Sequence, residues 1–182
     1  MARLLYALLF ASCSACAADT MTVEEAYAAI PHHRTVFSQH SSKLAPAQVR
    51  SLSQLFAWSD QGTVLRVQAL RDLRAGRLQD VRRTMDGYRT LIATLASSQP
   101  AAEIKPVQLL VLEAIQGHQR FFESKLQQSA NPARIDASFT PEVHQASEKL
   151  RRAYGLLMNN FPNEPSINKA AFYDYLCALD FL

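Results

Sequence analysis

Three histidines lie close together in one polar stretch of the sequence, and they are the first candidates for chemistry. His32 and His33 are adjacent, and His40 follows within the same segment. Neutral imidazole nitrogens are good ligands for zinc, copper and nickel. No cysteine or acidic residue stands at ligand spacing within the segment, which is also typical of a surface loop. The sequence therefore predicts a surface loop here, with a borderline divalent-metal site at these histidines as the alternative.

A second set of candidates consists of cations and one aromatic ring that can contact a partner or an anion. Arg34 and Phe37 lie beside the histidines, and residues 63–97 contain seven arginines against three aspartates. Such an excess can attract anionic lipid, lipopolysaccharide or cell-wall polymer. Charges of both signs at helical intervals are equally typical of a solvated helix face. Arg82 and Arg89, which flank an apolar helical seam, are the candidates for anion contact in this stretch.

His118 and Met85 form the third candidate pair, this time for a cofactor. His118 falls on the apolar stripe of its expected helix beside Gly117, and Met85 lies in the middle of the apolar seam of another. Histidine and methionine are common axial ligands of haem, so two facing helices could hold non-covalent haem b between them. The competing interpretation is a core histidine bonded to a backbone carbonyl or a tyrosine, and a methionine that fills a gap.

Several catalytic and cofactor motifs are missing from the sequence. There is no C-x-x-C-H, G-x-S-x-G, H-E-x-x-H, Walker A or dinucleotide-binding glycine pattern. The paired Glu and Glu-x-x-His pattern of di-iron bundles is also missing. We therefore assign no catalytic residue and expect a non-enzymatic protein.

Prolines separate segments with the 3.6-residue apolar repeat of helices, and almost no segment alternates as a strand does. Thr22 and Glu25 have the spacing of a capping box, which predicts a short helix before Pro31. Long helical segments are expected over 46–98, over 106–128, over 141–161 and from Ser166 onward. The first of them has a weak interruption at 60–62 and a hinge or end at Gly76. The pattern predicts an all-α, up-down bundle of four main helices plus a short N-terminal helix, with one more if the long stretch divides.

Residues 1–17 have the features of a cleaved export signal. Arg3 is followed by the apolar run Leu4–Ala11 and by small residues before Ala18, and the run is too short to span a bilayer. An alternative is lipoprotein processing, with acylation of Cys13 or Cys16. Simple cleavage leaves Cys177 as the remaining cysteine, so the mature chain has no intramolecular disulfide.

Composition completes the sequence-based expectation. The chain has 182 residues, 48% apolar and 19% charged, and this suits one domain rather than a disordered chain or a nucleic-acid binder. We expect the signal at 1–17, a short helix and polar connection at 18–45, and the bundle at 46–182. The predicted role is that of a periplasmic or secreted bacterial protein, an accessory that contacts an envelope protein or an anionic envelope component. The alternative is a haem- or metal-binding bundle for electron transfer or sensing.

Overall fold

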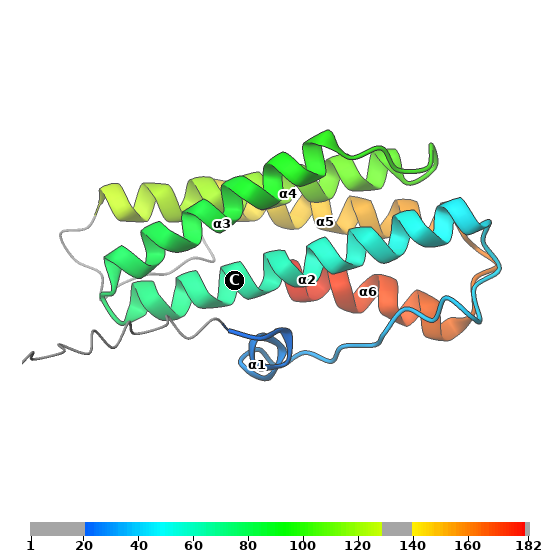
Figure 1. Cartoon of the computed structure of the whole chain (residues 1–182), viewed down its shortest axis with the longest axis horizontal. Helices are drawn as coiled ribbons and strands as arrows, with labels where there is room; N and C mark the ends of the chain where they lie inside the picture. The colour runs from blue at the N-terminus through cyan, green and yellow to red at the C-terminus, as the bar shows by residue number, and fades with distance from the viewer. Residues whose placement is uncertain (1–20, 129–139, 181–182) are drawn as a thin grey trace, which may run out of the picture.

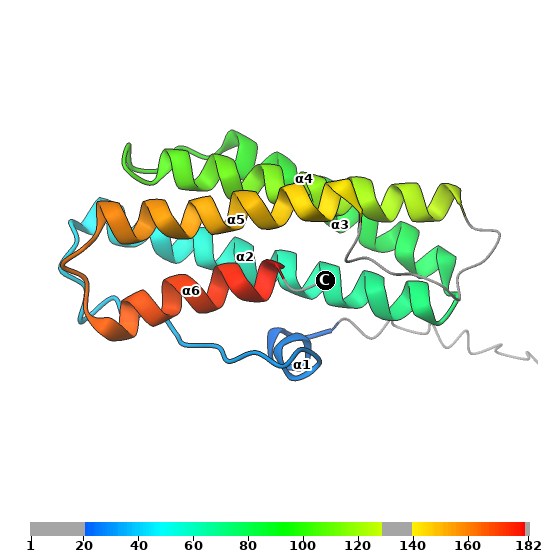
Figure 2. The same ribbon diagram turned by 180° about the vertical axis from the view of Figure 1, so that it is seen from behind.

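The computed structural model describes residues 21–128 and 140–180, and these form an all-α bundle of long helices (Figures 1 and 2). No strand occurs among these residues. The predicted export signal, with Cys13 and Cys16, lies outside them. The helices are α1 (Val23–Ala28), α2 (Pro46–Arg74), α3 (Leu78–Ser97), α4 (Lys105–Gln127), α5 (Pro141–Asn160) and α6 (Ser166–Asp180).

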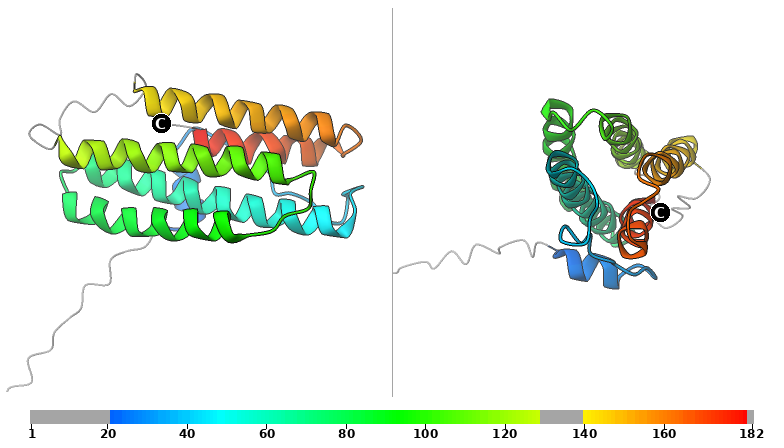
Figure 3. Two further views of the ribbon diagram at one scale, coloured as in Figure 1. Left: turned by 90° about the horizontal axis from the view of Figure 1, so that it is seen from above. Right: turned by 90° about the vertical axis from the view of Figure 1, so that its right-hand side faces the viewer.

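The five long helices form a closed ring. Each contacts the next in chain order from α2 to α6, and α6 returns to pack against α2. The short α1 contacts α2 and lies across the outside of the bundle, as the end-on view in Figure 3 shows. The all-α bundle is confirmed. It has five long helices rather than four because the stretch 46–98 does divide.

Local sequence explains where the helices begin and end. The Thr22 hydroxyl accepts from the Glu25 amide at 3.2 Å, and the Glu25 carboxylate accepts from the Thr22 amide at 2.8 Å, which is the predicted capping box. Pro46 occupies the first turn of α2, where a missing N–H costs nothing. Gly76 separates α2 from α3 with a φ of 70°, a conformation that side chains disfavour. The weak interruption expected at residues 60–62 does not occur, and α2 is continuous there.

The core lies where the apolar stripes of the five long helices meet. In α3 the predicted seam is buried at Val81, Met85, Tyr88 and Leu95. The helices α4 and α5 approach closely at Gly117, where an added Cβ would lie 3.4 Å from the Ala146 Cβ. Among the described residues, no helix is both long and apolar enough to cross a membrane.

Candidate functional site

Residues 31–45, which we call the strap, connect α1 to α2 and run along the outside of the bundle (Figure 1). The backbone of the strap bonds to polar side chains at α6. Asp174 accepts from the Thr35 amide at 2.9 Å, and Asn168 accepts from the Ser38 amide at 2.9 Å and donates to the Ser38 carbonyl at 3.1 Å. The strap is therefore part of the folded structure, although it contains no helix or strand.

Arg34 forms an ion pair with Asp60 of α2. Its Nη2 lies 2.6 Å from Oδ2 of Asp60, and its Nε lies 3.3 Å from Oδ1 of the same carboxylate. Asp60 also accepts from the Tyr27 hydroxyl at 3.0 Å. The paired carboxylate raises the pKa of Arg34, and burial together with Asp60 raises the pKa of Tyr27. The predicted anion-contact residue Arg34 instead joins the strap and α1 to α2.

Phe37, the aromatic residue predicted for a recognition surface, is a core residue. Its ring centroid lies 5.5 Å from that of Phe56 on α2 and 6.2 Å from that of Phe172 on α6. Its side chain is 7% exposed, so it offers little surface to a partner. The apolar contact anchors the strap between the two helices.

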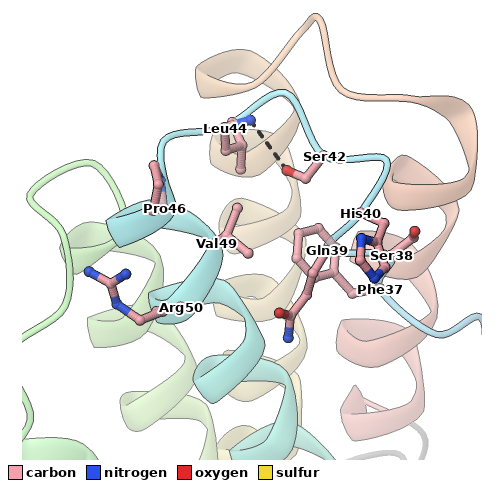
Figure 4. Close-up of a pocket in the computed structure, with 9 residues that line it drawn as sticks. All are labelled: Phe37, Ser38, Gln39, His40, Ser42, Leu44, Pro46, Val49 and Arg50. Carbon is pink, nitrogen blue, oxygen red and sulfur yellow. Dashed lines mark hydrogen bonds between the residues drawn. The ribbon is translucent and has the colours of Figure 1, made fainter.

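The structure does not bring His32, His33 and His40 together as a metal centre. The Nε2 atom of His32 lies 3.0 Å from the carbonyl oxygen of Asp174, while the side chain of His33 is exposed. His40 lines a cavity of about 690 Å³ between the strap and the start of α2, with Phe37 and Arg50 among its neighbours (Figure 4). Within residues 21–128 and 140–180, no three histidine, cysteine or acidic side chains are placed to hold a metal ion.

Arg82 and Arg89 are exposed on α3, as a solvated face requires. Arg89 pairs with Asp86 on the same helix and lies 3.9 Å from a Glu123 carboxylate oxygen on α4. Arg82 has no ion-pair partner in the described part of the chain. This face remains an accessible cationic surface, partly neutralised by its own acids.

A polar cluster in the bundle core is the feature that most needs explanation. Arg66 on α2, Tyr88 on α3 and His118 on α4 are each completely buried. Arg66 Nη2 donates to the Ala178 carbonyl at 2.7 Å, but its Nε and Nη1 have no hydrogen-bond partner. The Tyr88 hydroxyl and both ring nitrogens of His118 also have none. Most buried polar atoms are hydrogen-bonded, so this concentration is unusual.

Three close approaches place the cluster residues within about one helical turn of one another along the bundle. A Cβ on Gly87 would lie 2.6 Å from Leu65, so the next residues, Tyr88 and Arg66, lie within one turn of each other. A Cβ on Gly62 would lie 3.5 Å from Ile115, and Arg66 and His118 each follow about one turn later along parallel helices. The rings of Tyr88 and Phe122 are 6.1 Å apart, and Phe122 is one turn from His118.

Electrostatics within the cluster follow from burial without a counter-ion. Burial lowers the pKa of Arg66 to about 10, so the guanidinium is still charged at neutral pH. Burial and the nearby Arg66 charge lower the pKa of His118 to about 3, which keeps its imidazole neutral. Burial also raises the pKa of Tyr88. The cluster therefore has one positive charge and two neutral polar groups.

Met85, the predicted partner of His118 for haem, is also buried on α3, at 2% exposure. It lies one turn from Tyr88 on α3, and His118 lies one turn from Phe122 on α4. The ring contact between Tyr88 and Phe122 places both residues in the part of the core that α3 and α4 share, and the haem pair stays a prediction.

A groove lies on the surface between α1 and the C-terminal part of α2. It has a volume of about 670 Å³, and its apolar lining includes Met21, Ile30, Val67 and Leu70. Its charged lining consists of Glu25, Arg66, Arg71 and Arg74. Arg66 belongs to both the groove and the core cluster, so it connects the two. We call this feature the arginine groove.

Arg66 and the acceptors that hold the strap were not among the residues predicted from the sequence. The signal for Arg66 was its spacing, three residues after Thr63 and four before Leu70, because these positions share the apolar stripe of α2. Asn168 and Asp174 are isolated polar residues in an otherwise apolar C-terminal helix, and both are buried. All three are polar residues at positions where the helical pattern expects an apolar one, and this indicates a buried polar role.

No protein-family model matches the chain, and no curated protein or solved structure is significantly similar to it. The contacts and charges of the chain itself therefore carry the functional inference.

Proposed function

We propose that the chain is an exported bacterial envelope protein without enzymatic activity that binds an anionic lipid through the arginine groove. The observation that supports this proposal is the combination of apolar floor and cationic rim in one groove. An apolar floor with cationic residues around it suits an amphiphile better than a fully hydrated polymer, since only the amphiphile gains from both surfaces.

The charge of the groove favours an anion. Two exposed arginines, Arg71 and Arg74, lie along it against one acid, Glu25, and the buried Arg66 adds a third positive charge behind them. Arg71 reaches the Asp72 carboxylate at 3.9 Å, but that carboxylate bonds Arg77 at 2.6 Å, so Arg71 is only weakly neutralised. Arg74 has no ion-pair partner among residues 21–128 and 140–180. Both Arg71 and Arg74 are exposed, so their charges are available to a ligand.

The position of the groove in the chain supports contact with a membrane surface. Met21, which lines it, is the fourth residue after the predicted signal at 1–17. Under the lipoprotein alternative, acylated Cys16 would be five residues from Met21, a reach of at most about 18 Å. Under simple cleavage before Ala18, Met21 would be the fourth residue of the mature chain.

The test is co-sedimentation of the mature chain with phosphatidylglycerol vesicles across a salt series, with phosphatidylcholine vesicles as reference. We expect binding to the anionic vesicles that weakens as salt increases. The double variant Arg71→Gln/Arg74→Gln should weaken partitioning by roughly thirtyfold, from about 1 kcal/mol per charge. The matched control Arg82→Gln/Arg89→Gln makes the same change in charge on α3 and should bind nearly as wild type.

Each other outcome contradicts the groove assignment. If the α3 control loses binding and the groove variant does not, the lipid-binding surface is α3. Absence of binding to anionic vesicles at low salt removes the lipid proposal altogether. Intact mass of the exported protein answers the processing question separately, since added acyl mass identifies the lipoprotein route.

A second candidate function is a redox or sensing bundle that holds haem or a borderline metal. One observation favours it: neither ring nitrogen of His118 has a hydrogen-bond partner, as a ligating imidazole requires of at least one. Protein purified from an exporting host would then show a Soret band or bound metal. A colourless, metal-free protein whose melting temperature is unchanged by haem, zinc or copper would eliminate this function.

A further inference from the structure

We infer that Arg66, Tyr88 and His118 form a buried binding site for a single small inorganic anion. This inference does not depend on lipid binding, because it concerns the core cluster and not the rim of the groove. It rests on three buried side chains from three helices that lie within about one turn of one another in the core, with most of their polar atoms unpaired.

The first argument is the cost of leaving these groups as they are. A buried polar group without a partner is unfavourable, and a buried charge without one is more so. Arg66 keeps its charge in the core, and its single bond, to the Ala178 carbonyl, leaves Nε and Nη1 unpaired. A ligand that accepts hydrogen bonds from these atoms would remove most of this cost.

The second argument concerns the sign of the missing charge. Asp180 is near enough to raise the pKa of Arg66, but its carboxylate bonds the Ser147 hydroxyl and forms no ion pair with the guanidinium. The other groups that act on Arg66 are Tyr88, Tyr27 and Cys177. Tyr27 and Tyr88 have raised pKa values, so neither supplies negative charge at neutral pH. The guanidinium therefore lacks a paired anion within the described residues.

The third argument is the surplus of donors. Arg66 Nε and Nη1, the Tyr88 hydroxyl and one nitrogen of neutral His118 are all donors. The acceptors are only the second His118 nitrogen and the Tyr88 oxygen. Water both donates and accepts, whereas an anion only accepts, so an anion matches this set better. Arg66 also lines the arginine groove, so the cluster approaches the surface on that side.

The experiment titrates the mature protein with sodium bromide, using sodium gluconate at equal ionic strength as the reference for screening. We expect saturable changes in the ring-nitrogen NMR shifts of His118 and a rise in melting temperature with bromide only. Arg66→Met should weaken the apparent affinity about ten- to hundredfold, the value of a charge-assisted hydrogen bond. The exposed control Arg82→Met should respond as wild type.

The outcomes are distinguishable. Equal responses to bromide and gluconate, or an unchanged bromide response in Arg66→Met, overturn the anion site. If Arg66→Met does not fold, a bromide-soaked crystal of wild type decides: an anomalous peak among the three side chains supports the site, and water or nothing there overturns it. A Soret band that is present in the purified protein and lost in His118→Ala would assign His118 to haem and also overturn the anion site. Arg71→Gln/Arg74→Gln should keep the bromide response whether or not vesicle binding is lost.

Discussion

Asn168 should hold the strap to the bundle, and replacing it by alanine should destabilise the protein. The Asn168 side chain is completely buried and makes three hydrogen bonds. It accepts from the Ser38 amide at 2.9 Å, donates to the Ser38 carbonyl at 3.1 Å and donates to Glu164 at 2.6 Å. Glu164 in turn accepts from the Lys43 amide at 2.6 Å, so Asn168 supports two points of the strap.

The magnitude follows from these bonds. Three hydrogen bonds contribute about 1 kcal/mol each, and the buried Glu164 carboxylate loses one of its donors. Alanine has a higher helix propensity than asparagine, and this offsets the loss of folding stability by roughly 0.5 kcal/mol within α6. We therefore expect Asn168→Ala to lower the free energy of unfolding by about 2–3 kcal/mol.

The assay is urea unfolding followed by circular dichroism, combined with hydrogen exchange of the strap amides. Asn160→Ala is the matched control, because Asn160 is exposed and donates one bond, to the Glu103 carbonyl at 3.2 Å. It should change stability by less than about 0.5 kcal/mol. In Asn168→Ala the Ser38 amide should exchange much faster while the core amides of α4 stay protected. A loss of stability as small as that of the control, or unchanged exchange at Ser38, would refute the role of Asn168.

Three further predictions concern other parts of the fold. Asp60→Asn should cost about 1–3 kcal/mol, and a double-mutant cycle with Arg34→Met should give a coupling of about 1–2 kcal/mol; additive effects would contradict the pair. Gly155→Ala should stabilise the protein by about 0.5–1 kcal/mol in urea unfolding, because nothing lies within 4 Å of the added Cβ; a destabilised variant would contradict this. Burial lowers the pKa of His118 from its ordinary value of 6.5 to about 3, so its contribution to stability is present above pH 6.5 and is lost as pH falls toward 3. His118→Gln should reduce the slope of stability against pH in this range by up to about 1.4 kcal/mol per pH unit, and an unchanged slope would count against a buried neutral imidazole.

The helices could be predicted because their signals are local. A capping box at Thr22, a proline in the first turn of α2 and Gly76 after its end each act within a few residues. The apolar seam of α3 has the helical period and is buried as predicted. Local signals could not show whether residues 60–62 interrupt α2, because packing of Gly62 against α6 and α4 keeps the helix continuous there.

The candidate site could be predicted only in part, because long-range contacts decide which polar residues are free. Arg34 pairs with Asp60 across 26 residues, and Phe37 packs against Phe172 of the last helix. No sequence pattern near Arg34 or Phe37 predicts that Asp60 and Phe172 are their partners. His118 was expected to be buried and is, whereas Arg66 beside it was counted among the surface arginines. An arginine within an apolar stripe was the overlooked sign.

The most direct test of the proposed function maps the lipid-contacting surface by hydrogen exchange, with and without phosphatidylglycerol vesicles at low salt. We predict added protection at the end of α2 around Arg71 and Arg74 and in the region from Met21 to Ile30, with α3 around Arg82 and Arg89 unchanged. Protection confined to α3, or an identical exchange pattern with and without vesicles, would contradict the assignment of the arginine groove as the lipid-binding surface.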